Sequence, residues 1–244
     1  MQVYVLLQPE RHVNEMGTYL AYYMTGFIMI PVFIFAVVCQ MKVKSNFNKY
    51  SRIANSRGMS GAEAAYRLLQ LNGITDVKIK CIAGDLTDHY NPKTKEICLS
   101  ENVFNSRSIA AVGIACHEAG HACQHAESYF PLKVRNMVIP ITNIGSMAGI
   151  PLALMGFFFS FDPLIYIGIA LYGAVALFQL ITLPVEFNAS ARALRTIEQN
   201  GFLVAEENQG AKKVLTAAAL TYVAALVSAL ATLLRLLLLA NRKR

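Results

Sequence analysis

Three long stretches without a charged side chain constrain the fold of this chain more than any other feature. They cover residues 19–39, 137–161 and 163–185, and each reaches the roughly 20 residues needed to cross a bilayer core. A fourth stretch, 214–240, is apolar apart from Arg235. Only 15% of the 244 residues are charged, against about 25% in a typical soluble domain, which argues against buried core helices. We therefore predict three or four transmembrane helices, the last of which spans the membrane or re-enters it.

Basic side chains gather beside these stretches and predict how the chain is oriented. Five follow the first stretch and two precede the second: Lys42, Lys44, Lys49, Arg52, Arg57, Lys133 and Arg135. The positive-inside rule therefore places residues 41–136 and 184–213 in the cytoplasm, in a multi-pass protein of the inner or plasma membrane. Because the clusters adjoin the spans, orientation and anionic lipid explain them, and we expect no nucleic-acid binding. A spanning last helix conflicts with this rule, since it would leave the three basic residues of 241–244 outside.

Helix and strand signals fill the segments outside the apolar stretches. Ser60 and Glu63 form a capping box that starts a helix, and Gly73 ends it. Two strands are predicted at 76–82 and 95–99, joined through the turn at 91–94. Two further helices are predicted, one from Ser106 or Ser108 to Glu127 and one from Pro184 to Asn200-Gly201. The exposed part is thus expected to be α+β, with a small sheet laid against helices.

The run His117-Glu118-Ala119-Gly120-His121 lies in the second of these helices and predicts a metal site. Histidines four residues apart share one helix face, so both imidazoles can reach one ion. Glu118 can take a proton from the ion's bound water, as in H-E-x-x-H metallopeptidases, where Zn²⁺ also polarises the scissile carbonyl. We therefore predict one Zn²⁺ per chain, with His117 and His121 as ligands and Glu118 as the catalytic base. The alternative is a pair of core histidines.

A tetrahedral catalytic zinc needs a third protein ligand. His125 continues the same helix face, but eight residues of helix separate it from His117 by about 12 Å. Glu186 is the better candidate, because it is the only acidic residue between Asp162 and Glu198 and begins a predicted helix. A carboxylate in a first turn can equally be a partner of the helix dipole, so the residues alone leave both roles open.

Other polar residues are weaker candidates for the same site. Ser190 and Asn188 could orient the metal ligands through hydrogen bonds. His89 and Tyr222 could donate a hydrogen bond to a transition-state oxyanion, although an exposed turn histidine explains His89 more simply.

Cysteines do not enter the predicted site. Four of the five fall in the predicted cytoplasmic part, where disulfides are rare. Cys116 and Cys123 flank the histidine motif, and small core residues explain them better than zinc ligation does. At the other end of the chain, Glu10, Arg11 and Glu15 precede the first apolar stretch, so we predict an uncleaved anchor rather than a signal peptide.

Several longer motifs are specific enough to suggest a family. They are 42–44 with SGAE at 60–63, LTDHY at 86–90, RSIAAV at 107–112, 117–124, LPVEFNAS at 183–190 and 217–224. With these motifs the chain resembles the YugP-like neutral zinc metallopeptidases, which are bacterial membrane proteins, from about residue 25 onward. The broader clan that it resembles includes the HtpX-type and CAAX-prenyl endopeptidases, in which a Glu on a later helix completes the zinc site. That resemblance implies Glu186 as third ligand. An Asp commonly stands four residues after that Glu, whereas this chain has Ser190.

Together these features predict an α+β membrane protein, mostly helical, with a small cytoplasmic zincin-like domain that contains a short β-sheet. Its expected parts are an anchor span at 1–40, the zincin-like part with the histidine motif at 41–136, a transmembrane hairpin at 137–183, a cytoplasmic helix with the third ligand at 184–213, and a transmembrane or re-entrant helix at 214–244. The expected function is a zinc endopeptidase that cuts membrane or membrane-proximal proteins. The alternative is a non-catalytic membrane scaffold or regulator with a structural zinc.

Overall fold

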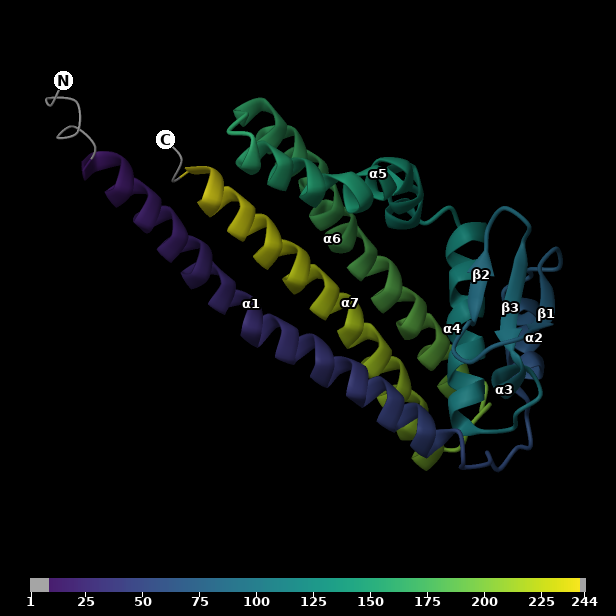
Figure 1. The fold of residues 1–244 in the computed structure, drawn as a ribbon. Helices are drawn as coiled ribbons and strands as arrows, with labels where there is room; N and C mark the ends of the chain where they lie inside the picture. Colours follow the sequence, from purple (N-terminus) through teal and green to yellow (C-terminus); the bar gives the residue numbers. More distant parts are fainter. Residues whose placement is uncertain (1–8, 242–244) are drawn as a thin grey trace, which may run out of the picture. The chain divides into compact units, whose positions relative to one another are not determined.

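The structure is a computed structural model that describes residues 9–241, with side chains from residue 26 onward (Figure 1). Within that range the chain is mostly helical and carries one small sheet, which confirms the predicted α+β class. The helices are α1 (Pro9–Tyr50), α2 (Gly61–Leu71), α3 (Glu101–Phe104), α4 (Ile109–Ala126), α5 (Phe130–Phe158), α6 (Asp162–Gln199) and α7 (Ala205–Asn241). The strands are β1 (Lys78–Ile82), β2 (His89–Asn91) and β3 (Glu96–Ser100).

Among the described residues, four helices are long enough and contain a sufficiently apolar stretch to cross a membrane: Gly26–Tyr50 within α1, and α5, α6 and α7. Large apolar side chains on them face outward, with Phe33 69%, Met147 79% and Phe158 83% exposed. Such exposure is unfavourable in water but suits a lipid environment. The predicted membrane spans are thereby confirmed as four apolar helices, the last of them uninterrupted to Asn241.

The described chain forms two compact units. One comprises the residues up to Val37, Val138–Gln179 and the residues from Ala224, and the other comprises Val38–Met137 and Leu180–Val223. In the first unit, glycines bring α5 and α6 into backbone contact. A Cβ atom on Gly145 would lie 2.3 Å from the carbonyl oxygen of Leu171, and one on Gly168 would lie 2.5 Å from the backbone nitrogen of Ala153. Small residues that allow this approach are typical of helix pairs in membranes.

The second unit is built around α4, which is buried along most of its length and consists largely of Ala, Gly and Cys. Figure 1 shows the three strands next to this helix, and β2 and β3 contact it directly. The strand order is β1-β3-β2, with β1 parallel and β2 antiparallel to β3. The short edge strand β2 was not expected, and the turn at 91–94 joins β2, not β1, to β3.

Side-chain caps start two helices of the second unit, α2 and α4. The Ser60 hydroxyl accepts a hydrogen bond from the Glu63 backbone, and the Glu63 carboxylate accepts one from the Ser60 backbone, which confirms the capping box. The Ser108 hydroxyl accepts from Ala111 N and starts α4. The helix start predicted at Pro184 is not observed, because Pro184 lies inside the continuous helix α6. A proline removes one internal hydrogen bond, and the apolar residues before it form helix nonetheless.

Candidate metal centre

Gly120 determines how closely α6 approaches α4. A Cβ atom at this position would lie 2.7 Å from the backbone oxygen of Ala189, closer than real Cβ contacts. Only glycine therefore allows the two helix backbones to meet here. Ala189 stands three residues after Glu186, so this contact places the Glu186 side chain against the face of α4 that carries His117 and His121.

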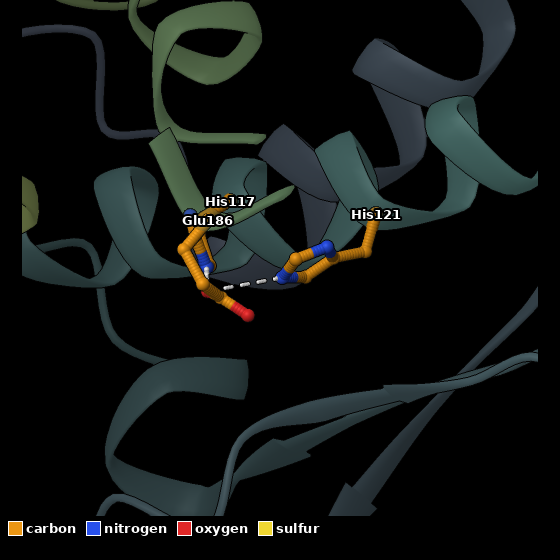
Figure 2. Close-up of side chains that lie close together, drawn as sticks. All are labelled: His117, His121 and Glu186. Atoms are coloured by element: carbon orange, nitrogen blue, oxygen red, sulfur yellow. Dashed lines mark ion pairs between the residues drawn. The ribbon is translucent and has the colours of Figure 1, made fainter. Parts of the chain in front are cut away.

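The side chains of His117, His121 and Glu186 converge on one point (Figure 2). The Oε2 atom of Glu186 lies 3.3 Å from His117 Nε2 and 3.5 Å from His121 Nε2. All three side chains are largely buried, with exposed fractions of 14%, 12% and 5% in chain order. Among the described residues, these three form a group whose ligand atoms all lie within 4.8 Å of one another.

These distances fit a zinc ion. Two ligand atoms about 2.05 Å from a tetrahedral ion are about 3.3 Å apart, which matches both separations. The Oε2 atom of Glu186 is buried and has no hydrogen-bond donor, whereas Oε1 accepts from Arg135 Nη1 at 3.2 Å. An unsatisfied buried carboxylate oxygen costs free energy unless a cation satisfies it. The residues therefore fit a zinc ion held by two imidazoles and one carboxylate.

The electrostatic surroundings also favour a cation. Burial favours the neutral imidazole of His121, but the nearby carboxylates of Glu186 and Glu118 outweigh burial and raise the pKa of His121. A site that raises the pKa of a buried imidazole stabilises positive charge. The same field would stabilise a divalent metal ion.

Each of the two histidine rings also has a hydrogen-bond partner at Nδ1, the ring nitrogen that does not face Glu186. His117 Nδ1 lies 3.1 Å from the Ser190 hydroxyl, and His121 Nδ1 lies 3.0 Å from Gln124 Oε1. Gln124 in turn donates to Asn188 Oδ1 at 2.9 Å. Ser190 thus contacts one histidine directly, and Asn188 contacts the other through Gln124.

A cavity of about 210 Å³ opens beside the cluster. Its polar lining comprises His117, Glu118 and Glu186 together with Asp88, Ser190 and Tyr222. Its remaining lining is apolar and comes largely from α1 and α7, including Val43, Phe47, Val214 and Ala218. Glu118 is 8% exposed, so the candidate base faces a confined space shared with two of the candidate ligands.

The structure brings Asp88, rather than its neighbour His89, to this cavity. His89 is exposed on β2, and its Nδ1 lies 2.8 Å from the Thr87 carbonyl oxygen. Asp88 accepts hydrogen bonds from Ser100 N and Oγ. Burial raises the pKa of Asp88, although the Ser100 hydrogen bonds act in the opposite direction.

Two other groups of sequence interest lie outside the cluster. His125 Nδ1 lies 2.8 Å from the Tyr90 hydroxyl, which ties the end of α4 to β2. Cys116 and Cys123 are free and buried, and burial raises the pKa of both thiols, that of Cys123 to about 11. Protonated thiols are poor metal ligands, in keeping with their expected role as small core residues.

Sequence reasoning missed three residues that shape the site: Asp88, Gln124 and Arg135. Gln124 stands three residues after His121 on the same helix face, which was a usable signal. Arg135 was explained by its position beside a span, and its contact with Glu186 depends on how α5 and α6 come together. Asp88 lies within the LTDHY motif, but nothing in that motif indicates which side chain faces the site.

Comparisons with known proteins agree with this geometry. A family model described as "Putative neutral zinc metallopeptidase" matches residues 25–241. A protein of Bacillus subtilis (strain 168), named "Putative membrane protease YugP", is 47% identical over 213 residues, which cover 87% of this chain and 95% of that protein. No solved structure matches the chain.

Proposed function

The chain belongs to the family described as "Putative neutral zinc metallopeptidase", and on this basis we propose that it is a zinc-dependent endopeptidase of the membrane. One observation carries the proposal. Two imidazole Nε2 atoms meet an otherwise unsatisfied carboxylate oxygen, at tetrahedral spacing, beside a cavity that also holds a second carboxylate, Glu118. His117, His121 and Glu186 would hold one zinc ion per chain.

The chemistry follows from the residues around the cavity. A bound zinc would supply a Lewis acid that polarises the scissile carbonyl and makes a water molecule more acidic. Glu118 would take the proton from the attacking water and pass it to the nitrogen of the leaving amine. Tyr222 lines the same cavity and carries a hydroxyl that can donate to the carbonyl oxygen as it gains negative charge. Ser190, Asn188 and Gln124 would keep the histidine rings in place.

The number of ligands favours catalysis over a structural role for the metal. Structural zinc sites are closed by four protein ligands, whereas catalytic sites keep one position open. Among the described residues, the cluster offers three ligands and borders a cavity. A scaffold protein would also have no use for Glu118 beside the metal, because a buried carboxylate is costly to keep.

The position of the site suggests where its substrates come from. Glu186 directly follows the apolar stretch 163–185 on the continuous helix α6, so the site would lie close to the membrane surface. The apolar cavity wall fits an uncharged side chain of the substrate. The edge strand β2, which contacts α4, could pair with an extended segment of substrate. We therefore propose membrane or membrane-proximal proteins as substrates.

The orientation of the site is part of the same proposal. The excess of Lys and Arg in 41–136 and 184–213 supports a cytoplasmic position for the site in the inner or plasma membrane. Cleavage within the bilayer is less favoured, because α4, which carries the histidines, is not among the four helices that are apolar enough to span.

A comparison of three forms of the purified protein tests the proposal. The wild type should contain about one zinc per chain and cleave an unfolded or membrane-derived polypeptide. Glu118→Gln should retain zinc and lose cleavage by a factor of about 10² or more, because the proton acceptor is gone. Glu198→Gln, an exposed carboxylate on α6, is the matched control and should behave as wild type. Equal cleavage by wild type and Glu118→Gln would refute the enzyme proposal.

A further inference from the structure

The side chain of Gln124 is fully buried and makes three polar contacts, which together fix its orientation. Its Nε2 donates to the backbone oxygen of Val185 at 2.8 Å and to Asn188 Oδ1 at 2.9 Å. Its Oε1 lies 3.0 Å from His121 Nδ1. A backbone carbonyl oxygen can only accept, so the NH₂ end of the amide must face Val185. In the flipped orientation two oxygens would lie 2.8 Å apart without a proton between them.

This orientation decides which nitrogen of His121 carries a proton. The amide oxygen of Gln124 can only accept, so His121 Nδ1 must donate to it. In the neutral ring the lone pair is then on Nε2, which is the atom that faces Glu186 Oε2 at 3.5 Å. The buried amide therefore prepares His121 as a ligand before any metal arrives.

The hydrogen-bond partner of His117 does not fix the tautomer of its ring. The Ser190 hydroxyl, 3.1 Å from His117 Nδ1, can donate or accept by rotating its proton. It is compatible with either protonation of the His117 ring. Of the two candidate histidine ligands, only His121 has its tautomer fixed by its neighbour.

Gln124 is itself held by a chain of contacts that reaches the surface. Asn188 Oδ1 accepts from Gln124 and also from Arg192 Nε at 2.8 Å. The Arg192 guanidinium then binds both carboxylate oxygens of Glu127 at 2.7 Å. Two donors converge on Asn188 Oδ1, so its amide orientation is fixed as well. This series of hydrogen bonds links the C-terminal end of α4 to α6 and restricts the rotation of each side chain in it.

We propose that Gln124 is a positioning residue for the metal, which holds His121 in the Nδ1–H tautomer and so presents Nε2 to the ion. The proposal rests on the zinc site proposed above, but the tautomer itself is a property of the metal-free chain. Residues that hold a ligating imidazole typically contribute about 10- to 100-fold to metal affinity. Gln124 should therefore affect zinc binding even though it does not touch the ion.

Three variants separate this role from simple filling of space. Gln124→Met keeps the volume but removes every polar contact, and Gln124→Glu keeps an acceptor for His121 Nδ1. Gln70→Met is the matched control, because Gln70 is an exposed glutamine on the helix α2 whose side chain donates a hydrogen bond to the Tyr66 hydroxyl. Zinc affinity is measured by competition with a chelator. The His121 tautomer is measured by ¹⁵N NMR of histidine-labelled, metal-free protein at a pH where the ring is neutral.

We expect wild-type His121 to carry its proton on Nδ1, and Gln124→Met to bind zinc about 10- to 100-fold more weakly. Gln124→Glu should retain more of the affinity than Gln124→Met, and Gln70→Met should match wild type. An Nε2–H tautomer in wild type, or equal zinc affinity of folded Gln124→Met and wild type, would overturn the proposal. If Gln124→Met does not fold, the wild-type tautomer and Gln124→Glu decide. A wild type that binds no zinc would instead refute the proposed function. The NMR result would still decide whether His121 carries its proton on Nδ1.

Discussion

Replacing Gly120 by alanine tests whether close packing of α4 against α6 builds the site. The added Cβ would lie 2.7 Å from the Ala189 backbone oxygen, and ordinary contact begins near 3.4 Å, so the helices must separate by about 0.7 Å. The clash would be between the new Cβ atom and a backbone oxygen, so no flexible side chain can move to relieve it. The backbones of the two helices must therefore shift. Ala189 lies one helical turn after Glu186, so the proposed third ligand moves with it.

The size of this shift sets the expected effect. Zinc–ligand distances tolerate only about ±0.2 Å, so a displacement of about 0.7 Å should weaken zinc binding about tenfold or more. Overpacking costs about 1–3 kcal/mol, while the better helix propensity of alanine returns about 1 kcal/mol. We expect Gly120→Ala to lower the free energy of unfolding by about 0–2 kcal/mol and to lose most of its activity.

Gly113 offers a matched control on the same helix. A Cβ atom there would lie 3.5 Å from the Ala211 side chain, which is ordinary contact. Gly113→Ala should therefore gain about 1 kcal/mol from helix propensity and bind zinc as wild type does. The two variants are compared by thermal unfolding in detergent and by zinc competition. If Gly120→Ala matches Gly113→Ala in both assays, the close approach of the helices does not build the site.

Three further outcomes are expected. Glu186→Gln should weaken zinc binding by at least about 10²-fold in a chelator competition, because a neutral amide replaces a charged ligand. The control Glu198→Gln should bind zinc as wild type does, and equal affinities of the two variants would exclude Glu186 as a ligand. Asp88→Asn should raise the melting temperature at neutral pH, because the raised pKa of Asp88 means that its ionised form opposes folding. This gain should shrink as the pH falls below the folded-state pKa and vanish below the ordinary pKa of an aspartate, and a pH-independent gain would contradict the assignment. Ala218→Leu should narrow the cavity of about 210 Å³. It should lower kcat/KM about tenfold or more for peptides with a large apolar residue at the scissile bond, but not for peptides with alanine there. Equal losses for both peptides would mean that the substrate's apolar side chain does not bind in this cavity.

The membrane helices and the histidine motif could be predicted because their signals are local. Uncharged stretches of sufficient length identify spans without knowledge of their packing, and the H-E-x-x-H spacing depends only on helix geometry. The capping signals at Ser60 and Ser108 likewise act within one helical turn. These features were predictable from short windows of sequence.

The rest of the site depends on contacts between distant segments. Glu186 stands 65 residues after His121, and its position beside the two histidines depends on the approach of α6 to α4 at Gly120. The edge strand β2 is three residues long and too short for an alternating pattern to indicate it. The helix start expected at Pro184 was wrong because a proline favours a first turn locally, whereas the apolar stretch before it continues the helix.

The unsatisfied Oε2 atom of Glu186 has a consequence for the lifetime of the protein in the cell. Zinc that binds the folded chain adds its binding free energy to that of folding, and a metal-free chain carries the cost of the buried oxygen instead. A difference of a few kcal/mol in the free energy of unfolding changes the fraction of unfolded molecules many-fold, and cellular proteases degrade unfolded molecules. If zinc binds at the proposed site, the abundance of this protein should follow the supply of zinc, and a shortage of the metal should lower the amount of the protein as well as its proposed activity.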